Sequence, residues 1–222
     1  MTLPTRSALA LIVLALSAGA IPASAQADSV TVEIRPTASR FVGLIEFLRS
    51  TATDGRQGAA LRQRFEASEY ADVDSEARRR FGTLNLDAYT HTYDGYPPTH
   101  GQAAVGAWTS FIVAAAKAQG WDDLRDRTAG LFPNDVQGVI LEAMRDTEAA
   151  YDALVWGVHA DDVRGQVDAF SAYVGRHQLG AAAHRLATFY GSAWPDALPI
   201  WVAFHPVPPG EGSAQPWPGM WP

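Results

Sequence analysis

The segment NDVQGVILEAMRDTEAAYDALVW, residues 134–156, decides the fold class of this 222-residue chain. Its apolar residues recur with the period of an amphipathic helix, which places them on one face. A stripe of this kind normally packs into a protein core. We therefore expect a buried helix from Asn134 or Asp135 to about Trp156. The positions on the expected buried face are Val136, Ile140, Ala143, Met144, Thr147, Tyr151, Leu154 and Val155.

Similar stripes predict helices on both sides of this segment. Before it, helices are expected around residues 41–48, with Thr37 or Ser39 as the cap, and over about 59–70, 74–86 and 102–118. After it, Asp161 or Asp162 is expected to begin a last long helix that ends near Tyr190. Two glycines are expected to divide that helix, namely Gly175 and Gly180.

Two short strands are expected, one near each end of the mature chain. Residues 30–34 alternate apolar and polar side chains, which is typical of a strand, and Pro36 then leads into the first helix. Residues 198–205 form a second strand that is largely apolar on both sides, so both faces should be covered. The predicted fold class is therefore mainly α, a helical domain with a minimal β element.

The first 25 residues have the features of a secretory signal peptide. Arg6 precedes the apolar run of residues 8–16, Pro22 ends that run, and Ala23-Ser24-Ala25 matches a cleavage site. The run is shorter than the roughly 20 residues that cross a bilayer, and no later stretch is long and apolar enough. We therefore expect a periplasmic or secreted protein with no membrane span in the mature chain.

The composition of the whole chain is compatible with one globular domain. Hydrophobic residues make up 47% of the chain and the formal charge is −7, which argues against a wholly disordered chain and against nucleic-acid binding. Cysteine is absent, so an exported chain must be held by its core rather than by disulfides. We expect one helical domain over residues 26–205 and a tail over 206–222 that is rich in proline, glycine and tryptophan.

No motif for a known catalytic chemistry is found. None of the six histidines is followed by glutamate, and no two are three to five residues apart, whereas zinc hydrolases commonly place two histidines one turn apart on a helix. There is no G-x-S-x-G, no P-loop and no dinucleotide-binding loop. We predict no catalytic residue, no metal ligand and no cofactor. A glycosidase carboxylate pair stays open, because it is defined in space rather than in sequence.

Three segments form a layout shared with a known family. They are the strand and helix of residues 30–48, the long helical middle, and Phe189-Tyr190-Gly191 followed by PIWVAFHP at residues 199–206. In this order they resemble the opening part of secreted, gluzincin-like zinc metallopeptidases of bacteria. The resemblance implies a helical region, then a small sheet, then a helix bearing H-E-x-x-H. This chain has no H-E-x-x-H, so the zinc, its water and the general base are missing.

Two functional hypotheses follow. The first is an exported soluble helical protein that resembles the non-catalytic N-terminal portion of a zinc metallopeptidase and is inactive as given. The second is a periplasmic or extracellular helical module that binds or scaffolds a protein or peptide partner and has no enzymatic ancestry. Trp201 and His205, on one side of the apolar strand, are the candidate partner-binding residues. An unpaired apolar edge also favours self-association through residues 198–205.

Overall fold

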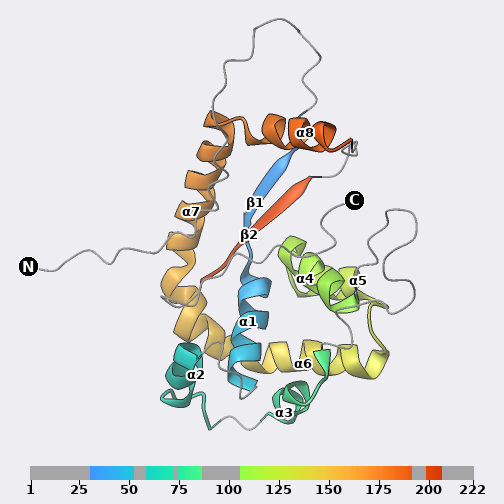
Figure 1. The fold of residues 1–222 in the computed structure, drawn as a ribbon. Helices are drawn as coiled ribbons and strands as arrows, with labels where there is room; N and C mark the ends of the chain where they lie inside the picture. The colour runs from blue at the N-terminus through green and yellow to red at the C-terminus, as the bar shows by residue number, and fades with distance from the viewer. Residues whose placement is uncertain (1–30, 53–58, 73–74, 87–105, 192–198, 207–222) are drawn as a thin grey trace, which may run out of the picture.

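Figure 1 shows a helical body, as predicted from the periodic stripes, with a small sheet beside it. In the described residues this sheet consists of β1 and β2. The computed structural model describes residues 31–52, 59–72, 75–86, 106–191 and 199–206. The mainly α class with a minimal β element is confirmed. The predicted signal peptide, residues 1–25, and residues 207–222 of the predicted tail lie outside the described residues.

Helix α1, Arg40–Ala52, forms the centre of the core. Its residues from Phe41 to Leu48 are buried with the exception of Glu46, which is half-buried. A helix that is apolar on nearly all sides must be covered on all of them, and α1 contacts four other helices. These are α2, Ala59–Glu66, α3, Glu76–Gly82, α4, Ala107–Lys117, and α6, Asn134–Tyr151. Ser39 begins α1, because its Oγ accepts a hydrogen bond from the Val42 amide at 3.3 Å, as a helix cap does.

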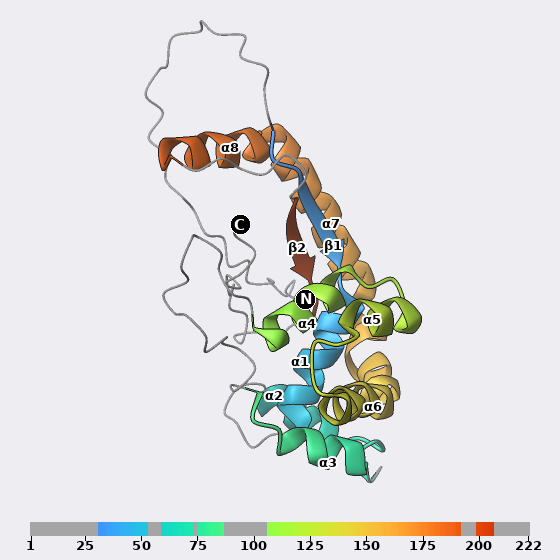
Figure 2. The ribbon, with the colours of Figure 1, turned by 90° about the vertical axis from the view of Figure 1, so that its right-hand side faces the viewer.

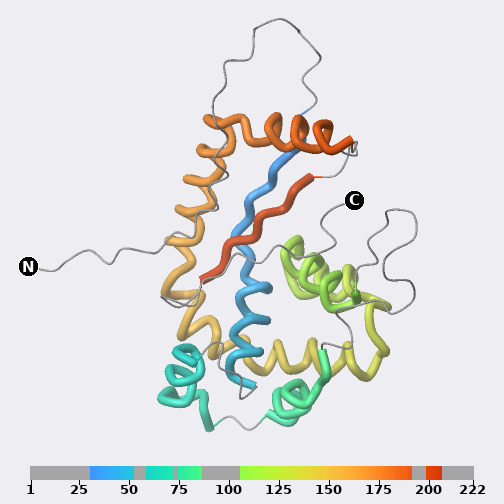
Figure 3. The backbone as a smooth tube through the Cα atoms, in the orientation of Figure 1, coloured from blue at the N-terminus to red at the C-terminus, as the bar shows by residue number. Residues whose placement is uncertain are grey.

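The predicted helix of residues 134–156 is present, but it does not end near Trp156. Helix α6 continues through a π-helical turn, η2, Asp152–Trp156, into α7, Gly157–Arg176. The expectation that a new helix begins at Asp161 or Asp162 is therefore wrong. The Gly157 amide bonds to the Asp152 carbonyl five residues earlier, so the helix bends without losing its backbone pairing. Figure 3 shows the continuous path and the bend.

Several helices before and after α6 differ in their bounds from the prediction. Helices α2 and α3 are shorter than the expected 59–70 and 74–86, and α5, Trp121–Thr128, follows α4 after a short turn. Helix α8, Leu179–Phe189, is separated from α7 by Gln178, whose φ of 50° is left-handed. The break thus lies between the two glycines that were expected to divide the helix. Figure 2 shows α8 at the end of the molecule farthest from α2, α3 and α6.

The two strands pair in parallel, with Ile34 opposite Ile200 and Ala38 opposite Phe204. Strand β2, Ile200–Phe204, lies within the predicted 198–205. Strand β1, Ile34–Ala38, begins where the predicted strand 30–34 ends, and it contains Pro36. The prediction for β1 was wrong because the register with β2 selects the paired residues. Val32 instead donates its amide to the Gly180 carbonyl on α8 at 3.3 Å.

Pro36 is compatible with β1 because of the direction in which its backbone points. The Glu33 carbonyl accepts from the Ile200 amide and the Ser39 amide donates to the Phe204 carbonyl, each at 2.8 Å. Backbone groups alternate in direction along a strand, so odd-numbered residues of β1 face β2 and Pro36 faces away. A proline in such a position removes no ladder hydrogen bond.

Tyr151 packs against Gly43, where α6 crosses α1. The Tyr151 side chain is fully buried, and its hydroxyl has no hydrogen-bond partner among the described residues. A Cβ at position 43 would lie 2.1 Å from that hydroxyl oxygen. Glycine at position 43 therefore permits the close approach of the two helices.

We predict that Gly43→Ala lowers the free energy of unfolding by about 1–3 kcal/mol, the usual cost of overpacking a core. The cost should shrink when Tyr151→Phe is also present, because the clashing oxygen is then removed. Tyr151→Phe alone should leave stability unchanged or raise it, since it deletes a buried hydroxyl without a partner. Urea denaturation of the four proteins measures the coupling. An equal cost of Gly43→Ala in both backgrounds would contradict this packing.

Candidate functional site

Strand β2 presents its two faces to different helices. Phe204 contacts Phe170 of α7, with ring centres 5.5 Å apart, so the side that carries Ile200, Val202 and Phe204 faces α7. On the other side Ala203 packs against the main core. Trp201 and His205 share that side with Ala203, because side chains alternate along a strand. Each face of β2 thus has a contact with the helical body, but all five residues of the strand stay half-buried.

Trp201 lies between two cations from different elements. The guanidinium carbon of Arg35, its neighbour on β1, is 5.5 Å from the ring centre, and Nζ of Lys117 at the end of α4 is 5.4 Å away. Both distances fit cation–π contact. Arg35 also binds Glu33 through two bonds of 2.6 Å. The sequence offered no sign that these three segments meet.

Lys117, the single lysine of the chain, carries a positive charge that no carboxylate balances among the described residues. Its pKa is lowered because burial disfavours the charged amine and because Arg127 and Arg35 are nearby cations. Arg127 is itself paired with Asp123 at 2.7 Å. An anion placed beside Trp201 would therefore find an uncompensated ammonium group.

His205 occupies a different place, against α1. Its Cβ lies 3.2 Å from the position of a Cβ on Gly43, the same position that the Tyr151 hydroxyl approaches. Burial lowers the pKa of His205, while the charge of Glu46 and a hydrogen bond with the Pro206 carbonyl act in the opposite direction. The neutral imidazole is thus favoured in the folded protein.

The structure does not bring Trp201 and His205 into one site. Four residues along a strand span about 13 Å, and their partners belong to different elements. Trp201 contacts Arg35 and Lys117, whereas His205 faces Gly43 and the Tyr151 hydroxyl. Trp201 is therefore the better candidate for contact with a partner, and His205 belongs to the packing of α1.

The outer edge of β2 has no strand beside it among the described residues, where the sheet contains β1 and β2 alone. Ile200 and Phe204 use their backbone groups to bond β1. The alternation of the strand then directs the amides and carbonyls of Trp201 and Ala203 away from β1. In Figure 2 no described helix or strand runs along this edge.

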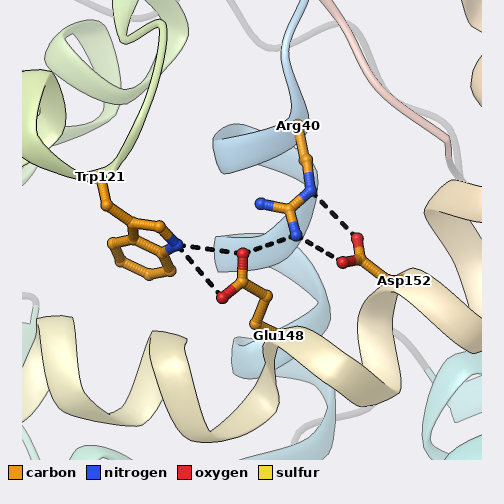
Figure 4. A network of polar contacts seen from close by, with 4 residues as sticks. All are labelled: Arg40, Trp121, Glu148 and Asp152. Atoms are coloured by element: carbon orange, nitrogen blue, oxygen red, sulfur yellow. Dashed lines mark hydrogen bonds and ion pairs between the residues drawn. The ribbon is translucent and has the colours of Figure 1, made fainter.

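Sequence reasoning missed a polar network at the start of α1, drawn in Figure 4. Arg40 binds Asp152 through contacts of 3.0 and 2.6 Å and binds Glu148 at 2.6 Å. Trp121 of α5 donates its indole N–H to the same Glu148, at 3.0 and 3.1 Å from the two carboxylate oxygens. The spacing of Glu148 and Asp152 by four residues on one helix face is a signal for a shared partner, but Arg40 lies 112 residues from Asp152.

The network fixes the first turn of α1 onto the π-helical turn. Burial by itself lowers the pKa of Arg40, but hydrogen bonds to Asp152 and Glu148 outweigh it and raise the pKa. The guanidinium therefore stays charged, as bidentate pairing with carboxylates requires. With one cation and two carboxylates held against each other, the arrangement is suited to joining helices and leaves no free acid or base for proton transfer.

The described part of the chain contains no group of three His, Asp or Glu side chains placed to hold a metal ion. His91 and His100 lie outside the described residues. His177 lies in the break after α7 and His184 lies on α8, so the unbroken helix that would have carried both is absent. Nδ1 of His184 is buried without a hydrogen-bond partner among the described residues.

One small hollow lies between α2, α3 and α6. Ser75 lines it, donates to Asp146 at 2.6 Å and accepts from the Arg78 amide at 3.0 Å. The hollow has a volume of about 10 Å³, which suffices for a single water molecule at most. In the Arg78-Arg79-Arg80 run beside it, Arg79 and Arg80 are exposed, whereas the guanidinium carbon of Arg78 lies 4.7 Å from the Phe65 ring centre.

Comparison with known proteins gives no relative from which a site could be transferred. No protein-family model, no curated protein and no solved structure matches this chain. No helix in the described part of the chain has the length and apolar character that crossing a membrane requires.

We predict that Arg40→Ala lowers the free energy of unfolding by about 1–2 kcal/mol, between the values typical of exposed and of buried ion pairs. The reason is that Glu148 and Asp152 would then face each other without a cation. Arg164→Ala is the matched control, because its ion pair with Asp161 is exposed, and it should cost close to nothing. Thermal and urea unfolding give both values. Equal effects of the two substitutions would show that the network does not hold α1.

His205 should make stability depend on pH. The unfolded chain binds a proton as the pH falls below about 6.5, whereas the folded ring resists protonation because its pKa is lowered. Stability conferred by the neutral ring is therefore present above pH 6.5 and is lost as the pH falls. The test compares unfolding at pH 7.5 and 5.5 in the wild type, His205→Gln and the control His159→Gln. The loss of stability between pH 7.5 and 5.5 should be smaller in His205→Gln than in the wild type, and His159→Gln should behave like the wild type. An equal loss in His205→Gln and the wild type would refute the assignment.

Proposed function

We propose that this chain is a non-catalytic helical binding module that takes an extended segment of a protein partner as a third strand. The segment would lie along the outer edge of β2. The observation that carries the proposal is the two-stranded parallel sheet, whose β2 edge has no partner among the described residues. Addition of a strand to such an edge is a common mode of peptide recognition.

The backbone of β2 supplies the groups that a third strand needs. Trp201 and Ala203 direct their amides and carbonyls outward, because Ile200 and Phe204 already bond β1. Two short strands form a marginal sheet in water, so an added strand would gain hydrogen bonds and also stabilise the existing pair. The helices on both faces hold β2 in position before the partner arrives, which lowers the entropic cost of binding.

The side chains beside this edge favour an acidic segment. Trp201 offers an aromatic surface, and Lys117 has no carboxylate partner among the described residues. A glutamate or aspartate of the partner placed next to Trp201 would pair with Lys117 without displacing an existing ion pair. Electrostatic complementarity of this kind contributes to the choice of partner.

We predict that Ala203→Pro abolishes or weakens peptide binding by about tenfold, because it removes an outward amide and leaves the bonds to β1 intact. The probes are peptides selected from a random library on the immobilised protein. Ala203→Ser is the matched control, since it keeps the amide, and it should bind like the wild type. Circular dichroism and thermal unfolding check that both variants are folded.

Three results would contradict the proposal. The first is a library that yields no binder, and the second is a set of selected peptides that bind the proline and serine variants equally. The third is occupation of the β2 edge by a second copy of the chain. Sedimentation at rising concentration would detect this as self-association of the wild type that is lost in Ala203→Pro. Lys117→Gln addresses the acidic preference, and it should lower affinity for glutamate-containing peptides and leave neutral peptides unaffected.

The second candidate is a peptidase-related protein that is inactive as given. It is favoured by the layout, because the parallel pairing joins the strand before the helical region to the strand after it. A small sheet at this point is what the resemblance to gluzincin-like metallopeptidases implies. Both candidates are non-catalytic, and they differ in ancestry rather than in present chemistry.

We predict that the purified protein holds no stoichiometric zinc, because its histidines have neither the sequence spacing nor, in the described residues, the clustering of a zinc site. Elemental analysis after dialysis against zinc measures this. One tightly held zinc per chain would contradict the prediction and would imply ligands from residues 87–105 or from the chain ends.

A further inference from the structure

Helix α8 exposes apolar side chains that the rest of the described structure does not cover. Leu186 is 41% exposed, Phe189 81% and Tyr190 73%. The Phe189 and Tyr190 rings contact each other edge to face, with centres 5.3 Å apart. Single exposed apolar residues are common, but here two lie on the last turn of α8 and the third, Tyr190, is its C-cap residue, so they are neighbours.

The contact that holds α8 in place lies on a different side of the helix. Gly180 is the buried residue of α8, and its carbonyl accepts the Val32 amide at 3.3 Å. A Cβ at position 180 would lie 2.2 Å from the Val32 carbonyl oxygen. Phe189 follows Gly180 by about two and a half turns and therefore points the opposite way. The apolar side is thus left open when α8 is seated on the body.

The charge of the chain changes sign along α7. Residues 134–168 contain eight carboxylates and two arginines, whereas residues 169–191 contain two arginines, two histidines and no carboxylate. Arg176, the last residue of α7, and Arg185, within α8, are both exposed. Figures 1 and 2 place α8 at the end of the molecule opposite α6. Among the described residues, α8 and the end of α7 therefore form a basic, aromatic end, next to an acidic segment made by α6 and most of α7.

We infer that α8 docks on an anionic lipid surface, with Phe189, Tyr190 and Leu186 inserted at the headgroup boundary and Arg185 and Arg176 beside the lipid phosphates. A helix with an aromatic apolar side flanked by arginine lies in the plane of a bilayer in this way. Tyrosine suits the boundary because its ring is apolar and its hydroxyl stays wet. The carboxylates of residues 134–168 are repelled by the same surface, which favours an orientation with α8 toward the lipid.

A protein groove would also accept an apolar helix, so protein association without vesicle binding is an outcome that counts against the inference. Eleven residues are too few to cross a bilayer, so α8 would lie on the membrane and leave the chain peripheral. The site is separate from the β2 edge, and neither proposal depends on the other.

The test measures the partition of the purified protein onto vesicles of phosphatidylcholine with 30% phosphatidylglycerol, by sedimentation at low and high salt. Phe189→Ser with Tyr190→Ser should lower partition at least about tenfold, because two aromatic side chains lose their burial. Arg185→Glu should lower it by a similar factor, and about 0.5 M salt should weaken wild-type binding, since salt screens the attraction.

Two control variants keep the result specific to α8. Val158→Ser replaces another exposed apolar side chain, 55% exposed, and Arg164→Glu reverses an exposed charge on α7. Both should bind vesicles like the wild type, and all variants share the same N-terminus, so differences between them report α8. Equal binding by the wild type and the double aromatic variant would overturn the inference. Equal binding of the wild type to pure phosphatidylcholine and to the anionic vesicles would also overturn it. So would a wild-type protein that forms a dimer and binds no vesicles, if the double aromatic variant is a monomer.

Discussion

The burial of α1 on nearly every side is the constraint on which the rest of this structure depends. Four helices cover it, and they can do so only where small or complementary residues let them approach. Gly43 makes room for Tyr151 of α6. At the half-buried start of the helix, Arg40 instead binds the carboxylates of Glu148 and Asp152. Apolar packing thus sets how closely α1 and α6 lie, and the ion pairs set their rotation.

The π-helical turn η2 transmits this arrangement to the sheet. Asp152 begins the turn and is bound to Arg40, so the bend between α6 and α7 is fixed to the start of α1. Helix α7 then leaves in the direction that allows it to pack on β1 and to meet Phe204 of β2. Strand β1 leads directly into α1 through Ser39. The pair of strands is therefore positioned by the same contacts that fix the core.

The two surfaces proposed for binding lie at the β2 and α8 end, where the described residues bury few side chains. The core ends near Ala203, and beyond it a two-stranded sheet and an eleven-residue helix extend with few buried side chains. The β2 edge offers backbone groups and an uncompensated lysine, which suits an extended acidic segment. Helix α8 offers aromatic rings and arginines, which suits a lipid surface. Different chemistry on adjacent elements would let one molecule hold a partner and a membrane at once.

The sequence by itself determined the local elements, and only the tertiary structure decided how distant ones meet. Periodicity placed α1, α6 and β2, because the burial of one face is recorded every few residues in the chain. Periodicity could not predict the bounds of β1, because pairing with β2 selects them. It also could not predict that α6 continues past Gly157 through a π-helical turn. Trp201 was proposed from the sequence as a candidate on β2, but its neighbours Arg35 and Lys117 were not foreseen. The Arg40 network joins residues 112 positions apart, and no local pattern records a contact whose geometry exists only after the helices have packed.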